Sequence, residues 1–496
     1  MAKTTGLRSM WQSLPLTRFT TRENYIWLVV ATVCIGAFMA ALDASIVNVA
    51  LPDMSTYFST SASVVSWVLI SYLLTLTAML TMFGRMADMW GRRPLYTFGF
   101  LVFIIGSATC GAAVNLPMLI TSRVLQAAGA AMLQANSVAI ITATVPASVR
   151  GRAIGFQGSA QAIGLSLGPA IGGGLIALFG WRAIFYVNVP VGLIGTIMAA
   201  MILPRDKLTS KKATFDWWGT LFMTPFLVLL MMALTEGNVW GWSSPRILGM
   251  FGAAVVFLLA FIGRELKFRA PLVDLRLFKI PVFSIGNFTG LLSYLAMFGV
   301  LFLMPFYLER VLSFDSALAG LILTAVPLGM TVVAPKAGAL ADRYGPRLLT
   351  TGGMFLTAVA ACGLALTVAV HADLFLLAGE LILVGAGLGV FTPPNNSSVM
   401  GSLPSARLGV GGGILNMARS LGMAMGTAIS GTIMAVFLIL NGGVERPGGP
   451  KGPWIPATRY ALYVLVGLSL LAAVLSVFRI ASQNRSAKME KMPMEW

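Results

Sequence analysis

The 496-residue chain has little charge, one histidine and three cysteines. Charged residues make up 10% of it, against about 25% in an ordinary soluble protein. Because the cysteines (Cys34, Cys110 and Cys362) lie far apart and no CxxC spacing occurs, no disulfide framework or structural metal site is indicated. With His371 as the sole imidazole, histidine-based catalysis is excluded as well. We therefore expect no metal, no cofactor and no enzyme activity.

Apolar residues dominate instead, at 57% of the chain with a mean hydropathy of +0.85. The first apolar run is too long for a signal-peptide core, so it is read as a permanent membrane span. A window of about 20 apolar residues predicts an all-α polytopic membrane protein with fourteen spans. The expected limits are 25–51, 62–83, 95–114, 117–141, 153–178, 186–203, 217–235, 246–263, 282–304, 316–336, 348–370, 374–398, 409–439 and 461–478.

The net charge of +17 is concentrated in the connections between these spans, which favours membrane topology over nucleic-acid binding. Most of the Lys and Arg residues fall in segments that share one side. Since Lys and Arg next to a span favour the cytoplasmic side, both termini are predicted to be cytoplasmic. The outer loops hold only six, namely Arg182, Arg246, Arg310, Arg446, Lys451 and Arg459.

A short charged loop occurs twice at a fixed offset of 254 residues. It reads GRMADMWGRR over 84–93 and GALADRYGPR over 338–347. A solvated polar turn is one interpretation; a gating loop, whose Asp holds a partner helix in one of two states, is favoured because the loop recurs. The residues assigned to gating are Gly84, Asp88, Gly91, Arg92, Arg93, Gly338, Asp342, Gly345 and Arg347.

The repeat extends beyond the loop, because Gly168 and Gly172 match Gly422 and Gly426 at the same offset. Duplicated halves are typical of membrane carriers. Spans 7 and 8 have no counterpart, so a 6+2+6 plan is predicted. Its parts are an N-terminal segment 1–24, a six-helix bundle 25–203, an inserted hairpin with linkers 204–281, a second bundle 282–478 and a tail 479–496.

Ionisable residues inside the spans are the first functional candidates. Asp43 in span 1 and Glu380 in span 12 are the only acids placed well inside a span. Arg123 in span 4 lies at nearly the depth of Asp43, so the two are expected to pair across facing helices. A structural ion pair and a proton or cation site both stay open; function is favoured because buried intramembrane acids are usually functional. Arg419 in span 13 is assigned to the same proton-coupling and substrate group.

Polar residues elsewhere in the spans predict a central cavity, because such residues rarely face lipid. The expected cavity residues are Gln126, Gln157, Gln161, Asn136, Asn395 and Asn396. Span 5 also carries the run GLSLGPAIGGG, in which small residues permit close helix contact and the proline bends the helix. Packing alone or a bend that changes between two states would explain this run, whose members are Gly164, Gly168, Pro169, Gly172 and Gly173.

The ordered features LDxxIVNVALP, GxxADxxGRR, RxxQxxG, GxxxGPxxGG and WRxxFxxNxP resemble the fourteen-spanner drug:proton antiporter family of the major facilitator superfamily. The resemblance covers nearly the whole chain and implies a major facilitator fold and proton-driven export by alternating access. One departure is Ala127, where the family usually has Gly, and it weakens the coupling role carried over to Arg123.

The resemblance predicts a secondary transporter that exports amphipathic, cationic drugs from a bacterial cell membrane, with the proton gradient as energy source. Protons, a small-molecule substrate and the lipid bilayer are its expected partners; the oligomeric state stays open, with a monomer favoured. The alternative is a dedicated exporter of a metabolite, lipid or siderophore on the same fold. An uptake carrier is less favoured because the glycine–proline run is similar to that of exporters. A membrane enzyme is less favoured because the chain has a single histidine.

Overall fold

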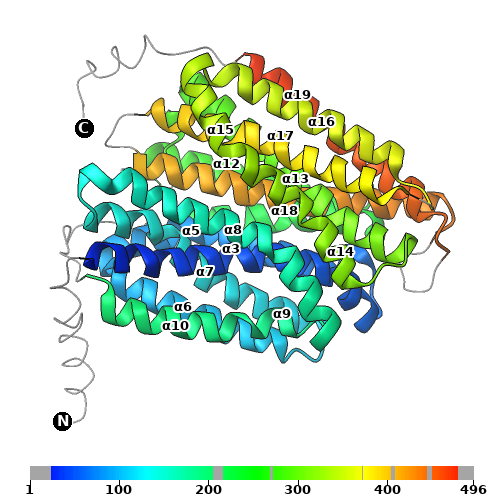
Figure 1. The fold of residues 1–496 in the computed structure, drawn as a ribbon, viewed down its shortest axis with the longest axis horizontal. Coiled ribbons are helices and arrows are strands. Elements are labelled where there is room, and N and C mark those ends of the chain that lie inside the picture. Colours follow the sequence, from blue (N-terminus) through cyan, green and yellow to red (C-terminus); the bar gives the residue numbers. More distant parts are fainter. Residues whose placement is uncertain are drawn as a thin grey trace.

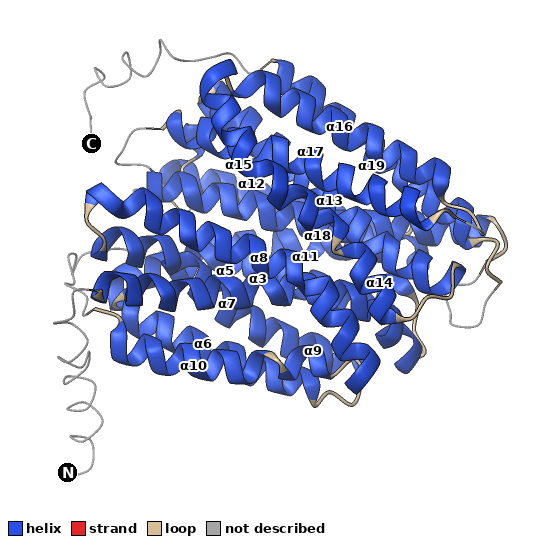
Figure 2. Ribbon diagram, viewed as in Figure 1, coloured by secondary structure: helices blue, strands red, loops and turns tan. Residues whose placement is uncertain are grey.

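A computed structural model describes residues 24–204, 216–268, 271, 273–370, 372–403, 408–443 and 450–478. Within these ranges the chain is helical and contains no strand (Figure 2). Fourteen helical stretches of the described chain are long and apolar enough to cross a membrane, which confirms the predicted number of spans. The N-terminal segment up to residue 23, most of the linker 205–215 and the tail 479–496 lie outside the described residues.

The first part of the chain forms eight helices, which are α3 (Tyr25–Tyr57), α4 (Ala62–Val65), α5 (Trp67–Trp90), α6 (Arg92–Gly111), α7 (Leu116–Thr144), α8 (Ala147–Phe179), α9 (Ala183–Tyr186) and α10 (Asn188–Ile202). Two helices follow, α11 (Trp217–Trp240) and α12 (Pro245–Lys267). The remainder comprises η1 (Leu275–Lys279), α13 (Pro281–Phe306), η2 (Tyr307–Val311), α14 (Ser316–Leu323), α15 (Ala325–Tyr344), α16 (Pro346–Thr367), α17 (Leu374–Gly401), α18 (Leu408–Leu440) and α19 (Trp454–Val477).

Helix contacts follow the same pattern in the two parts of the chain. In the first part α3 packs on α8, α6 on α7, and α5 on α7; in the last part α13 packs on α18, α16 on α17, and α15 on α17. Helices α11 and α12 pack on each other, and α11 also contacts α5 and α18. Figure 1 shows the blue and cyan helices of the first part below the yellow to red helices of the last. The two parts thus share a packing pattern, while the 6+2+6 plan and the domain boundaries stay predictions.

Backbone geometry repeats with the 254-residue offset. Ser59 and Ser313 are the only non-glycine residues of the described chain with positive φ, at 50° and 60°. Gly91 and Gly345 have φ values of 101° and 82°, and each donates its N–H to the carbonyl four residues earlier. Left-handed backbone is unfavourable for residues with a Cβ, so these turns depend on glycine. Ser59 and Ser313, which are also 254 residues apart, thus share a left-handed turn.

Glycines bring α8 and α18 against the first helix of their own parts. A Cβ on Gly168 would overlap Ser45 Oγ of α3, and one on Gly172 would come 2.7 Å from Ile46 Cγ1. A Cβ on Gly422 or Gly426 would collide with the carbonyl oxygens of Leu291 and Leu295 in α13. Without a hydrophobic force between helices in lipid, such close contact provides the packing energy.

Two local expectations differ from the structure. The first span was expected to end at residue 51, before a proline, but α3 continues through Pro52 to Tyr57. A proline removes one backbone hydrogen bond, and packing on both sides of the helix compensates for this loss. Helix α8 likewise runs unbroken through Pro169, so the functional bend assigned to that residue stays a prediction.

Candidate functional site: a buried ion pair and a central cavity

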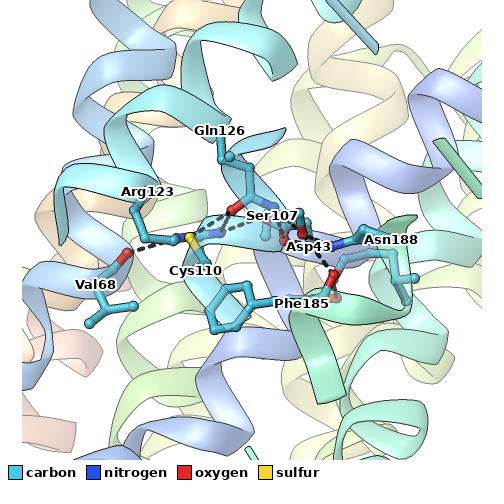
Figure 3. A network of polar contacts seen from close by, with 12 residues as sticks. Asp43, Val68, Ser107, Cys110, Arg123, Gln126, Phe185 and Asn188 are labelled. Carbon is cyan, nitrogen blue, oxygen red and sulfur yellow. Dashed lines mark hydrogen bonds and ion pairs between the residues drawn. The ribbon is translucent and has the colours of Figure 1, made fainter. Parts of the chain in front are cut away.

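Asp43 and Arg123 form an ion pair inside the first bundle, as their similar depth predicted. Arg123 Nη1 donates to Asp43 Oδ2 at 2.6 Å and to Gln126 Oε1 at 2.7 Å. Gln126 Nε2 and Asn188 Nδ2 donate to Asp43 Oδ1 at 2.8 and 3.0 Å, and both also reach Ser107 Oγ (Figure 3). Five side chains from four helices therefore share one hydrogen-bond network.

This network is closed off from solvent. Asp43 and Arg123 both have an exposed fraction of 0%, and the other three members are buried as well. The guanidinium is further held by the Val68 carbonyl, 3.0 Å from Nε, and by the face of the Tyr72 ring, 4.1 Å from Cζ. Buried charges are tolerated when they are paired and hydrogen-bonded, so the network is stable as long as every member stays in place.

Helix packing explains why these side chains meet. A Cβ on Gly106 in α6 would lie 2.5 Å from the Gln126 backbone, so glycine lets α6 approach α7 at the level of the network. Asn188 begins α10, and the neighbouring Phe185 carbonyl accepts from Ser107 Oγ at 2.8 Å. These close approaches place α6, α7 and α10 around the Asp43 side of α3.

Helix α8 joins this site to the other part of the molecule. One face carries Gly164 and Gly168, which lie against α3 beside Asp43. Its other face meets α14, because a Cβ on Gly173 would collide with the Ser316 carbonyl and one on Gly320 with the Pro169 carbonyl. The glycine–proline run therefore packs between the ion-pair helix and the second bundle, which confirms close packing as one of its roles.

A separate cavity lies between α13, α17 and α18. Arg419 is the only charged side chain among the described residues that line it. Its Nη1 donates to Gln161 Oε1 of α8 at 3.3 Å, and the Tyr294 ring centre lies 5.8 Å from Cζ. The full lining is Gly286, Asn287, Gly290, Tyr294, Phe391, Thr392, Asn395, Asn396, Leu415, Ala418 and Arg419.

Three residues of the predicted groups lie away from the cavity around Arg419. Gln126 and Asn136 were expected in a cavity, but Gln126 is buried with Asp43, and Asn136 donates to the Met132 carbonyl within its own helix. Glu380 lies between α16 and α17, where its Oε1 accepts from Thr367 Oγ1 at 2.8 Å, and its role in coupling stays a prediction. Spacing along a helix gives depth, whereas the direction of a side chain depends on which helices pack around it.

The remaining candidates divide into cavity and loop residues. Asn395 and Asn396 line the cavity as expected, Gln161 reaches it through Arg419, and Gln157 is half-buried. Arg92 and Arg93 donate to the carbonyls of Ala139 and Ala200, at 3.0 and 2.7 Å, on α7 and α10. Asp88 and Asp342 belong to α5 and α15, but their side chains lie outside the described part of the structure. Gly84 and Gly338 lie in the last two turns of α5 and α15, and Arg347 is the second residue of α16.

Several site residues escaped the sequence reasoning. Asn188 belongs to the WRxxFxxNxP feature, which by itself reads as an interfacial aromatic belt. The polar Asn at the start of an apolar span was the available signal. Ser107 and Tyr72 carried no signal in the sequence, since serine and tyrosine are common in membrane spans.

The ends of the two bundles that carry Ser59 and Ser313 are bonded to each other. Arg310 Nη2 donates to Thr56 Oγ1 at 2.7 Å and to the Pro52 carbonyl at 3.2 Å. Ser316 Oγ donates to Asp53 Oδ2 at 2.8 Å. We call this end of the molecule the Ser59 end and the opposite one, which carries Gly91 and Gly345, the Gly91 end.

Comparison with known proteins now places the chain. The sequence profile of the Major Facilitator Superfamily matches residues 33–290 and 286–492. The chain belongs to this superfamily. It is 35% identical to the riboflavin transporter RibZ of Clostridioides difficile (strain 630), over 93% of this chain and 99% of the relative. It is 31% identical to the multidrug resistance protein Stp of Mycobacterium tuberculosis (strain CDC 1551 / Oshkosh), over 82% of this chain and 75% of that protein.

The fold agrees with this assignment. A bacterial homolog of the human lysosomal transporter Spinster, solved in an inward-facing and unoccupied conformation, aligns with a TM-score of 0.68 at 15% identity, over 92% of this chain and 97% of that one. Members of the superfamily are secondary carriers and not enzymes. The protein is thus a multi-pass membrane transporter with drug-resistance relatives, and its fourteen spans fit the fourteen-spanner type. Its bacterial relatives are consistent with a bacterial cytoplasmic membrane.

Proposed function

We propose that this member of the superfamily is a proton-driven exporter of amphipathic small molecules that works by alternating access. The observation that carries the proposal is the Asp43–Arg123 pair, buried at 0% exposure within a membrane bundle. A carboxylate there is costly, and a site that binds and releases a proton is the usual reason for keeping one. Protonation of Asp43 would remove its attraction to Arg123 and loosen the network around it.

The contacts between the bundles indicate which face of the protein is closed in this conformation. Arg310, Ser316 and their partners bond the Ser59 end, which the Lys and Arg distribution assigns to the outer face. The cavity around Arg419 lies in the half of α13 and α18 near the Gly91 end, on the cytoplasmic side of that assignment. Cargo would enter there, and protons from outside would drive its release on the opposite face.

Transport into inside-out vesicles of expressing cells tests the proposal. With an acidic interior imposed, a fluorescent cargo should accumulate, and a protonophore should abolish the accumulation. Equal accumulation with and without the gradient would rule out proton coupling. Vesicles that carry an Asp216→Asn variant, in which the ion pair of α11 and α12 is changed instead, provide the control.

A second candidate is a dedicated metabolite carrier. RibZ, a riboflavin transporter, aligns over 99% of its own length, so transport of riboflavin is the specific form that this candidate takes. Accumulation of riboflavin alone, among a panel that includes cationic dyes, would favour the dedicated carrier. Accumulation of several unrelated compounds would favour a multidrug exporter.

A further inference from the structure

Arg419 is a half-buried cation with few partners. No acid of the described chain forms an ion pair with it, and its Nε is buried without a hydrogen-bond partner. Its one bond among these residues is to Gln161, at 3.3 Å, near the upper limit for a hydrogen bond. A guanidinium inside the membrane is costly unless anions, acceptors or aromatic faces surround it. The Nε of Arg419 is therefore a donor that an acceptor on a cargo in this cavity could bond.

The rest of the lining is uncharged and partly aromatic. Tyr294 and Phe391 offer ring faces, and Asn287 Oδ1 is a buried acceptor that also lacks a partner. Gly290 leaves space, because a Cβ there would have only Asn395 Nδ2 nearby, at 3.3 Å. Apolar walls with a few polar groups are the usual composition of small-molecule sites. The free volume in this conformation is only about 10 Å³, so a planar cargo would require α13, α17 and α18 to move apart. A cationic cargo would meet the repulsion of Arg419 without an opposing carboxylate.

We propose that this cavity selects planar compounds bearing a carboxylate or ring carbonyls, anionic or neutral, and that Arg419 is the residue that recognises them. The inference rests on the proposed exporter function and replaces the cationic cargo expected from the sequence. The fork of N–H donors on arginine fits a carboxylate or a carbonyl and repels an ammonium. Asn287 Oδ1 would accept from a ring N–H of the same cargo.

Binding of cargo would also affect the contact between the bundles. Gln161 belongs to α8 and Arg419 to α18, so their bond crosses from one bundle to the other. A cargo acceptor that takes the Arg419 donors releases Gln161. Loading of the cavity is then linked to loosening of the same α8 that packs on the helix of Asp43.

Equilibrium binding to the purified full-length protein in detergent, at constant pH and without a gradient, tests the inference. Fluorescein and a rhodamine share a xanthene ring and differ in charge sign, and riboflavin is a neutral, carbonyl-rich third probe. Fluorescence anisotropy should show tighter binding of fluorescein and riboflavin than of rhodamine. Arg419→Gln should weaken the first two by on the order of tenfold or more, as expected for loss of a charge-assisted hydrogen bond. Arg419→Glu should reverse the preference between the two dyes.

Two further variants keep the test decisive. Arg246→Gln makes the same change at an exposed arginine of α12 and should leave all three affinities unchanged. Gly290→Leu fills the cavity without altering charge and should weaken fluorescein and riboflavin binding even if the Arg419 variants fail to fold. Tighter native binding of rhodamine, or affinities insensitive to both Arg419→Gln and Gly290→Leu, would overturn the inference.

The outcome is separable from that of the proposed function. Arg419-dependent fluorescein binding without gradient-driven transport would contradict the proton-driven exporter and leave the cavity assignment intact. Gradient-driven transport of rhodamine that survives Arg419→Gln would support the proton-driven exporter and contradict the cavity assignment.

Discussion

Replacing Asp43 by Asn separates a structural ion pair from a proton-coupling site. The substitution keeps the shape of the side chain and removes its charge, so Arg123 loses its only ionic partner in the described chain. Removal of one partner from a buried pair costs about 3–5 kcal/mol. Since Arg123 keeps its bonds to the Val68 carbonyl and Gln126 and its contact with Tyr72, we expect a value near the lower limit.

The double variant Asp43→Asn/Arg123→Gln distinguishes a structural ion pair from a proton-coupling site. With both charges removed, no unpaired ion remains, so most of the stability lost in Asp43→Asn, about 3 kcal/mol, should be recovered. Unfolding in detergent micelles measures this recovery. Gradient-driven transport in vesicles should stay abolished in both variants, because neither has a carboxylate that can exchange a proton.

The partly exposed pair between Asp216 and Arg264 supplies the matched control. Arg264 Nε lies 3.0 Å from Asp216 Oδ1, and the two residues belong to the α11–α12 pair of helices. Arg264 is 32% exposed, and Asn at position 216 can still accept from the Gly219 N–H that Asp216 caps. Asp216→Asn and the corresponding double variant with Arg264→Gln should therefore cost less stability than Asp43→Asn and leave transport intact. If the Asp43→Asn/Arg123→Gln variant regained transport together with stability, the pair would be structural and the coupling site would lie elsewhere.

Three other outcomes follow from packing and from the loops. Gly168→Ala should destabilise the protein by about 1–3 kcal/mol, because the new Cβ overlaps Ser45. Gly158→Ala should leave stability unchanged, since no atom lies within 4 Å of its new Cβ; thermal unfolding of the two variants measures the difference. Arg310→Gln should open the Ser59 end, raising the distance between spin labels on α4 and α14; an unchanged distance distribution would argue against a gate there. Asp88→Asn should slow transport without weakening equilibrium binding of cargo, and a proportional loss of both would contradict a gating role.

The sequence was sufficient for the features that depend on position along the chain. Apolar length predicts fourteen spans, and a rise of about 1.5 Å per residue put Asp43 and Arg123 at one depth. The fixed offset also pairs Gly91 with Gly345, and both have positive φ. Each of these is a one-dimensional property that a helix converts directly into a height in the membrane.

Features that depend on the neighbouring helix could not be predicted in this way. Glu380 is polar and deep, like Asp43, but α16 supplies its partner and no arginine of the described chain pairs with it. Gln126 turned inward because Gly106 lets α6 close on α7, a contact between residues twenty positions apart. Asn188 bonds Asp43 only because α10 packs beside α3 and α6. Side-chain direction is thus fixed by three-helix packing, which no pattern within a single span records.

The position of α8 explains how two remote sites can influence each other. Its glycines Gly168 and Gly172 lie directly against Ser45 and Ile46 on α3, so a displacement of α3 would be felt by α8. On its other side the same helix meets α14 at Pro169 and reaches Arg419 through Gln161. A change in the charge of Asp43 that displaces α3 therefore acts on the contact between the bundles and on the cargo cavity together. If a proton at Asp43 and a cargo beside Arg419 both bias the position of α8, each would alter the affinity for the other by the same factor, because linked binding is reciprocal.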